Sequence, residues 1–165
     1  MSSIVAVSHN FETGHRLPHL KGKCESLHGH SWWATVEVTS PSDTSVVVEF
    51  GKFKSALRSW IDLRLDHGLM LGKADPLAEL MAIHGKTYIF GADDFTDDLA
   101  YPTVENVARL LARVGQQVLE TIERAPGSYV SRVEVTETHV NRAVWTGNLS
   151  RHVEAQHEVT TEGWS

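Results

Sequence analysis

Three histidines have the residue type and spacing of a metal site. His28 and His30 lie two residues apart in an alternating polar and apolar segment, and His15 ends an earlier segment of the same kind. Side chains two apart on a strand share a face, with Cα atoms ~6.7 Å apart, and two imidazoles can then reach one ion at ~2.0–2.1 Å. Three neutral imidazoles without a fourth protein ligand are typical of catalytic zinc. The alternative is a set of buried histidines satisfied by other polar groups.

A thiol and an acid–histidine pair are further candidates. Cys24, the one cysteine, lies in a charged loop next to Lys23 and upstream of His28. Nearby positive charge lowers the pKa of a thiol, although a lone cysteine is more often a small buried hydrophobe. Asp66 and His67 follow a segment with helical spacing, where a histidine is also favoured by the helix dipole.

Glu137 is expected on an apolar face near a strand end, because it shares the parity of Val133 and Val135. A buried carboxylate must be paired or hydrogen-bonded. Glu137 could meet an arginine, or it could bind the N–H groups of a ligand. Thr103 is expected as a helix N-cap. Glu105 in the first turn has the ordinary explanation that acids stabilise a helix start.

The elements that would position these residues follow from the hydrophobic spacing. Alternation predicts two half-buried strands and a later hairpin, at residues 4–15 and 28–39, then 129–138 with 142–147. Helical spacing predicts one helix over residues 52–65 and a second that opens at Thr103. Residues 46–50 fit a third strand or the entry to the first helix, and residues 68–101 are irregular, with a short strand expected at 86–90. The order predicts an α+β domain with two helices on one face of a four-stranded antiparallel sheet.

Composition indicates one ordinary soluble domain. The chain has 165 residues, 41% hydrophobic and 22% charged, without a repeat or linker, so residues 1–165 are expected to form a single domain. About the last 18 residues are polar and expected to be loosely ordered. No apolar run reaches the ~20 residues that span a bilayer, and the start lacks a secretory pattern. One cysteine forms no internal disulfide, which favours a cytoplasmic location. A net charge of −6 argues against nucleic-acid binding, and free sheet edges favour a homo-oligomer.

Five segments resemble the motifs of one family. FETGHRLP, KCESLHGH, LDHGL, PTVENVARLL and VTET run in order from residue 11 to residue 138. They are similar to the 6-pyruvoyl-tetrahydropterin synthase / 6-carboxy-tetrahydropterin synthase family. Any one segment is a weak signal, whereas five in order are specific. The resemblance implies the tunnelling fold, or T-fold, in ββααββ order. It also implies subunits that join their sheets into a barrel, commonly as trimers stacked into hexamers with interfacial active sites.

The resemblance assigns roles to the residues already singled out. The implied Zn²⁺ ligands are His15, His28 and His30. Cys24 would be the proton-transferring thiol, assisted by a pair from an adjacent subunit, Asp66 and His67. The implied anchor for the amino-pyrimidine edge of a pterin is Glu137, with Thr103 and Glu105 nearby.

The cysteine-to-histidine spacing resembles that of the bacterial 6-carboxy enzymes of 7-deazaguanine (queuosine) biosynthesis. The implied reaction converts 7,8-dihydroneopterin triphosphate to 6-carboxy-5,6,7,8-tetrahydropterin, with release of acetaldehyde and triphosphate. Three alternatives stay open: a 6-pyruvoyl-tetrahydropterin synthase, which eliminates triphosphate only, a non-catalytic pterin-binding relative, and a structural protein stabilised by a metal. A triphosphate needs local cations, and three are near in sequence: Arg16, Lys21 and Lys23.

Overall fold

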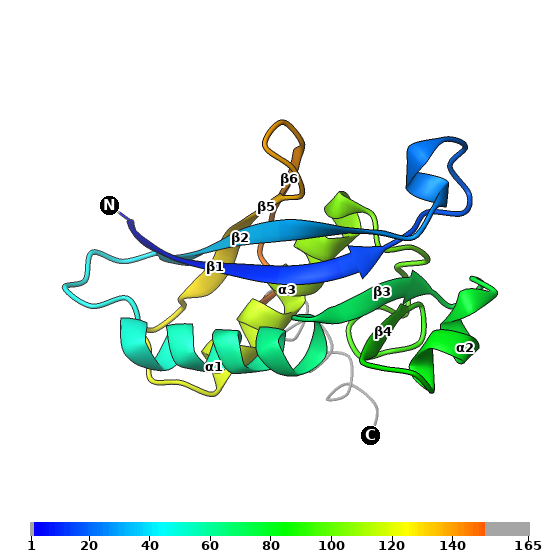
Figure 1. Cartoon of the computed structure of the whole chain (residues 1–165). Coiled ribbons are helices and arrows are strands. Elements are labelled where there is room, and N and C mark those ends of the chain that lie inside the picture. Colours follow the sequence, from blue (N-terminus) through cyan, green and yellow to red (C-terminus); the bar gives the residue numbers. More distant parts are fainter. Residues whose placement is uncertain (1, 151–165) are drawn as a thin grey trace, which may run out of the picture.

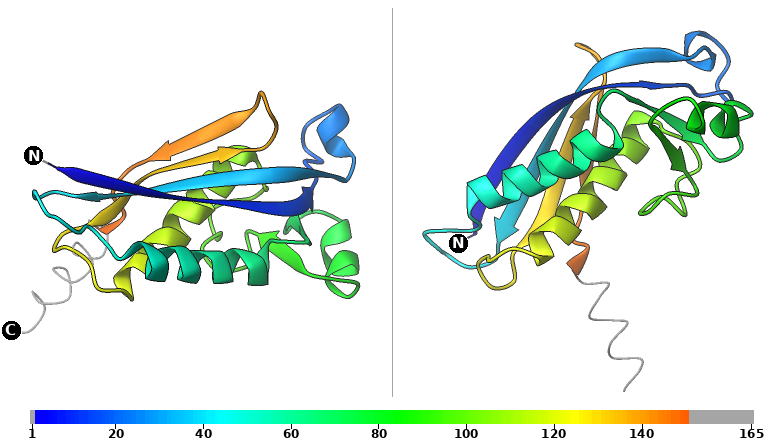
Figure 2. Two further views of the ribbon diagram at one scale, coloured as in Figure 1. Left: turned by 60° about the vertical axis from the view of Figure 1, so that its left-hand side comes forward. Right: turned by 60° about the horizontal axis from the view of Figure 1, so that its bottom comes forward.

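A curled six-stranded sheet forms the frame of the molecule. The computed structural model describes residues 2–150, and the polar C-terminal residues from 151 onward lie outside the described part. The strands are β1 (Ser3–His15), β2 (His28–Ser40), β3 (Gly68–Gly72), β4 (Thr87–Phe90), β5 (Tyr129–Thr136) and β6 (Arg142–Thr146). They lie in the order β4-β3-β1-β2-β5-β6. The long helices α1 (Phe50–Arg64) and α3 (Val104–Glu120) cover one face of the sheet (Figures 1 and 2).

The longest strands, β1 and β2, form an antiparallel pair over their whole length, with Ser3 opposite Ser40 and His15 opposite His28. Their helix-facing side chains are mostly buried and apolar, because alternate residues of a strand share one face, and the buried polar exceptions include His9, Thr13 and His15 on β1. The same core takes the buried stripes of both helices, which include Phe53, Leu57, Ile61, Val107, Leu111 and Val114. The expected strands at 4–15 and 28–39 are therefore confirmed.

The expected ββααββ order covers the long elements only. Between α1 and α3 the chain adds β3, the short helix α2 (Leu77–Ala82) and β4. β3 pairs in parallel with β1 over Thr13–His15, and β4 pairs in parallel with β3. The sheet therefore has six strands and is mixed, so the prediction of a four-stranded antiparallel sheet is wrong. The added strands are too short to show a clear hydrophobic period.

Local signals placed the other boundaries to within a few residues. Thr103 caps α3, as predicted, and its hydroxyl accepts the N–H of Asn106 at 3.3 Å. The first helix begins at Phe50 rather than residue 52, because the Glu49 carboxylate accepts the N–H groups of Gly51 and Lys52. Residues 46–50 are thus mainly the entry to α1, with a single bridge at Val48.

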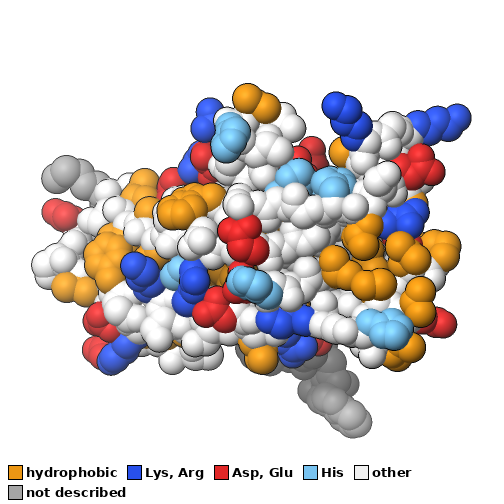
Figure 3. Space-filling view, in the orientation of Figure 1, with side chains coloured by type: hydrophobic (Ala, Val, Ile, Leu, Met, Phe, Trp, Pro, Cys, Tyr) orange, Lys and Arg blue, Asp and Glu red, His pale blue; other side chains and the backbone are white. Residues whose placement is uncertain are grey.

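The other face of the sheet is mostly polar, although Ile4, Trp33 and Val144 are exposed on it. Arg132 on β5 forms ion pairs with Glu37 on β2 and with Glu134 two residues along its own strand. In Figure 3, acidic and basic side chains are interspersed, and hydrophobic side chains gather both over the side that carries α2 and at the opposite end of the molecule. Leu80 and Ile83, in and after α2, are exposed. In the part of the chain that the structure describes, no helix is long and apolar enough to cross a membrane.

Candidate metal and catalytic site

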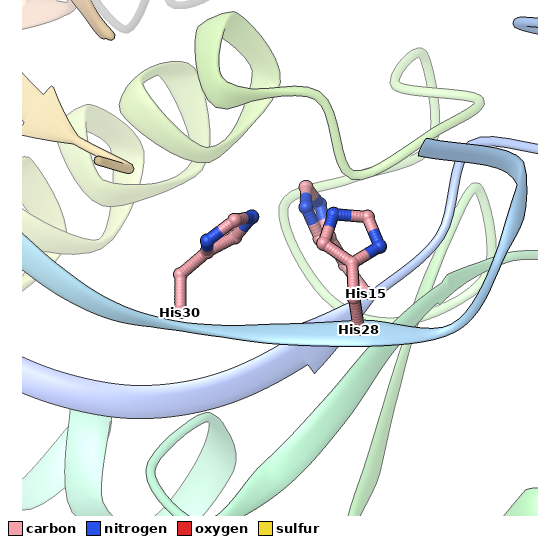
Figure 4. Close-up of side chains that lie close together, drawn as sticks. All are labelled: His15, His28 and His30. Atoms are coloured by element: carbon pink, nitrogen blue, oxygen red, sulfur yellow. The ribbon is translucent and has the colours of Figure 1, made fainter. Parts of the chain in front are cut away.

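The three predicted histidines come together at one end of the β1–β2 pair. The register sets His15 opposite His28 and Thr13 opposite His30, so all three rings share one face. The ring centroids are 4.7 Å (His15–His28), 4.8 Å (His28–His30) and 5.2 Å (His15–His30) apart. One potential ligand atom from each ring lies within 4.8 Å of the others. Figure 4 shows the rings rising from β1 and β2 toward the segment that leads into α3.

Backbone carbonyls orient two of the rings for metal binding. His15 Nδ1 lies 2.9 Å from the carbonyl oxygen of Pro102, and His28 Nδ1 lies 2.6 Å from that of Ser26. A carbonyl oxygen only accepts, so each Nδ1 carries the proton and each Nε2 presents a lone pair. Such outer hydrogen bonds fix the tautomer of metal-binding histidines.

The buried Nε2 of His15 fits a metal ligand. It has no hydrogen-bond partner among the described residues, and the His15 side chain is completely buried. An unpaired buried nitrogen costs free energy, which a bound cation would offset. Three imidazoles in reach of one point also match the donor set of a catalytic zinc site. The residues therefore fit a zinc ion.

Glu137 lies beside the histidines rather than with an arginine. Its Oε1 is 3.3 Å from His15 Nε2, though without hydrogen-bond geometry, and 3.8 Å from His30 Nε2. The neighbouring His15 ring lowers the pKa of the Glu137 carboxyl, against the effect of burial. Burial lowers the pKa of His30, and Glu137 opposes that shift. The ionised form of the carboxylate is thus favoured beside the histidines, as it would be for a ligand-binding or metal-neighbouring group.

A buried tryptophan supports the same cluster. Trp32 lies two residues after His30 on β2 and is fully buried. Its ring contacts those of His15 and His30 edge-on, at centroid distances of 5.0 and 5.7 Å. Its Nε1 donates to the carbonyl of Thr13 at 3.0 Å. Trp32 therefore limits the rotation of both histidines.

Cys24 lies apart from the three-histidine cluster. It is half-buried in a single 3₁₀ turn, Lys23–Glu25, and its carbonyl accepts the N–H of Leu17 at 2.7 Å. Its sulfur is not among the grouped ligand atoms of the described residues. Three basic side chains were suggested to bind the triphosphate, and two of them, Lys21 and Lys23, are exposed on this loop. Arg16 instead pairs with the buried Asp75.

Asp66 and His67 form a pair at the edge of β1. The Asp66 carboxylate accepts the N–H of Glu12 at 2.8 Å and bonds His67 Nδ1 at 2.8 Å. Burial alone would raise the pKa of Asp66, but these two hydrogen bonds outweigh it and hold that pKa below its ordinary value. The His67 side chain is 79% exposed. Glu12 is three residues, or about 10 Å of strand, before His15, so the pair does not join the histidines of its own chain.

The start of α3 contacts the cluster through its backbone. Pro102, just before the Thr103 cap, supplies the carbonyl that holds His15. Glu105 is exposed in the first turn of α3 and makes none of the ion pairs found in the described residues. Sequence reasoning missed the roles of Pro102, Ser26 and Asp75. Backbone carbonyls carry no residue signature, and Asp75 lies in the irregular segment.

The fold and the cluster define an α+β protein with three histidines that could hold one metal ion. The family described as "6-pyruvoyl tetrahydropterin synthase" matches residues 4–148. The chain belongs to this family of enzymes, as the resemblance predicted.

Curated relatives carry a more specific name. The chain is 32% identical over 104 residues to a 6-carboxy-5,6,7,8-tetrahydropterin synthase of Rickettsia typhi, covering 49% of this chain and 75% of that one. It is 36% identical over 88 residues to the one of Synechocystis, with 48% and 68% covered. For Aquifex aeolicus the identity is 29% over 159 residues, with 84% and 94% covered.

Solved structures share the fold. An uncharacterized protein from Wolinella succinogenes aligns with a TM-score of 0.68 at 21% identity, covering 90% of this chain and 99% of that one. The 6-pyruvoyl tetrahydropterin synthase of Caenorhabditis elegans aligns with a TM-score of 0.58 at 20% identity, with 90% and 97% covered. At these identities the likeness concerns the T-fold alone.

Proposed function

We propose that the protein is a zinc-dependent lyase of 7-deazaguanine (queuosine) biosynthesis. It converts 7,8-dihydroneopterin triphosphate to 6-carboxy-5,6,7,8-tetrahydropterin and releases acetaldehyde and triphosphate. The observation that carries the proposal is the cluster of His15, His28 and His30 with Glu137 alongside, in which backbone carbonyls free the Nε2 atoms of His15 and His28. The names of the curated relatives support this product.

The proposed zinc ligands are His15, His28 and His30. When bound, zinc would act as a Lewis acid toward the hydroxyl groups of the substrate side chain. Trp32 and the carbonyl of Pro102 keep the rings in place, so the chain spends little free energy on ordering them when a cation binds.

Recognition of the pterin is assigned to Glu137. One ionised carboxylate can accept an amino group and a ring N–H side by side, and charged acceptors form the stronger hydrogen bonds. The lowered pKa of Glu137 keeps it in that form. Thr103 and Glu105, at the start of α3, are proposed to line the same pocket, near the strand end that presents Glu137.

Proton transfer at carbon is assigned to Cys24, Asp66 and His67. Asp66 fixes the His67 ring through Nδ1, which leaves Nε2 on the exposed side. Because this pair lies away from the cluster of its own chain, we propose that it serves the site of an adjacent subunit. The outer edge of β1 over residues 3–9 and that of β6 have no strand partner in the described residues, which favours a trimer or hexamer.

Product analysis tests the proposal. Purified zinc-loaded protein should convert 7,8-dihydroneopterin triphosphate to the 6-carboxy product, read by mass spectrometry, with an equal amount of acetaldehyde read by a coupled dehydrogenase assay. Triphosphate without acetaldehyde would assign the 6-pyruvoyl reaction instead. Tight pterin binding without either product would assign a binding protein.

A further inference from the structure

The segment inserted between α1 and α3 contacts the loop that carries Cys24. We call residues 68–102 the inserted segment and residues 16–27 the Cys24 loop. Both lie at the same end of the molecule in Figures 1 and 2. The loop has one 3₁₀ turn and four hydrogen bonds of its own backbone among the described residues, so outside contacts decide its position.

The first contact is a buried ion pair. Arg16 Nε lies 3.3 Å from Asp75 Oδ2, without hydrogen-bond geometry; the Asp75 side chain is fully buried and that of Arg16 is 20% exposed. The other oxygen, Asp75 Oδ1, accepts the N–H of Leu77 at 2.9 Å, at the start of α2. A buried carboxylate requires a countercharge, so Arg16 is held where Asp75 and α2 put it.

The second contact is an aromatic stack. The rings of His19 and Tyr101 lie 3.8 Å apart between centroids, at 22° to each other. Tyr101 directly precedes Pro102, whose carbonyl holds His15. The same stretch of the inserted segment therefore touches both the metal cluster and the Cys24 loop.

Arg16 is connected to Cys24 through its neighbour Leu17 and one backbone hydrogen bond. Leu17, next to Arg16, is 6% exposed, and its N–H donates to the carbonyl of Cys24 at 2.7 Å. A shift of Arg16 must therefore move Leu17 and, with it, the backbone of the thiol. A buried ion pair of this kind contributes little net stability compared with apolar residues, so stability is a weak reason for its presence.

We propose that Asp75 is a positioning residue for Cys24, acting through Arg16, and that Tyr101 is a second one, acting through His19. This inference rests on the proposed role of Cys24 as the proton-transferring thiol. A displacement of ~1 Å can cost a reaction ~10²-fold, so the inserted segment sets the turnover rate without touching the substrate.

Two pairs of variants test the inference. Asp75→Asn removes the countercharge of Arg16, and Asp98→Asn is its control, because Asp98 belongs to the same segment but pairs with Arg113 on α3. Tyr101→Leu removes the stack, whereas Tyr101→Phe keeps it. Iodoacetamide alkylation reads Cys24 alone, since the chain has one cysteine. Zinc content and kcat and KM per zinc-loaded chain are measured on the same samples.

Asp75→Asn and Tyr101→Leu should keep one zinc per chain. Their alkylation rate should differ from that of the unchanged protein by about threefold or more, because access and thiolate fraction set thiol reactivity. Their kcat should fall about tenfold or more with little change in KM. Asp98→Asn and Tyr101→Phe should match the unchanged protein.

Unchanged alkylation and kcat in zinc-loaded Tyr101→Leu would overturn the inference, even if Asp75→Asn fails to fold. A fall in zinc content that accounts for all lost activity would also overturn it. If the unchanged protein itself shows no turnover, the proposed function fails. The alkylation comparison then still decides whether the inserted segment positions Cys24.

Discussion

Zinc should stabilise this protein strongly, and His28→Ala should remove that effect. A ligand that binds only the folded state at ~1,000 times its dissociation constant adds about 4.1 kcal/mol to the free energy of unfolding. For a domain of this size, 165 residues, 1 kcal/mol corresponds to ~2–4 °C in Tm. Saturating zinc should therefore raise the Tm of the metal-free protein by ~8–16 °C.

His28 is the best ligand to remove, because its loss disturbs the apoprotein least. Its ring is partly exposed and makes one hydrogen bond, to the carbonyl of Ser26. Losing that bond should cost the metal-free protein only ~0.5–1.5 kcal/mol. His15→Ala would instead leave a cavity and an unpaired Pro102 carbonyl in the interior. The prediction thus concerns the zinc-dependent shift and not the Tm of the apoprotein.

The assay is a thermal melt of chelator-treated protein with and without zinc, near pH 7.5, beside elemental analysis. His28→Ala should show a zinc-dependent shift below ~4 °C, equivalent to about 1 kcal/mol, and well under one zinc per chain. His84→Ala is the matched control, since His84 is exposed and lies outside the cluster. If His28→Ala kept one zinc per chain and the full shift, the ligand assignment would be wrong.

Three further predictions concern the other site residues. Cys24→Ala should keep zinc but lose ~10²–10⁴-fold in turnover, as expected for a missing general acid or base; loss of zinc would make Cys24 a ligand. Glu137→Gln should keep zinc and weaken pterin binding about tenfold or more in calorimetric titration, equivalent to ~1.4 kcal/mol, whereas unchanged affinity would remove Glu137 from the pocket. Because the folded-state pKa of Asp66 is lowered, its stabilising effect is present above its unfolded pKa of ~3.9 and is lost as pH falls through the folded value. Asp66→Asn should therefore be less stable than the unchanged protein in urea at pH 6, with a narrower gap at pH 3; an equal gap at both would contradict this account.

The three-histidine cluster could be predicted because its geometry follows from strand parity. His28 and His30 are two apart, and His15 has the parity of the buried residues of its own strand. The three histidines then come together if the two strands pair with His15 opposite His28, and the structure shows this pairing. Glu137 was found by the same parity rule, although its contact with His15 was not foreseen.

The inserted segment could not be predicted by such a rule. β3 has five residues, α2 six and β4 four, and each is shorter than the window in which a hydrophobic period is clear. Their positions depend on pairing with β1, which is more than 50 residues away in sequence at Thr13 and Gly68. No local preference specifies such a partner.

The hydrogen bonds that orient His15 and His28 could not be predicted from the sequence for a different reason. The carbonyls of Pro102 and Ser26 belong to the backbone, and any residue at those positions could supply them. What makes Pro102 suitable is its place before the α3 cap, which fixes the direction of the chain there. The sequence could indicate the cap but not its distance from His15.

The structure separates the residues proposed to bind zinc and substrate from those proposed to transfer protons. The histidines and Glu137 lie on one buried face and are held by strands, a tryptophan and the start of α3. Cys24 lies on a loop held from outside by the inserted segment. Asp66 and His67 lie at an exposed edge. Binding groups gain from rigid elements, because ordering them at the moment of binding would cost affinity. A proton-transfer group must also approach the reacting carbon closely, and we propose that a loop held at two points gives Cys24 this position apart from the histidine cluster.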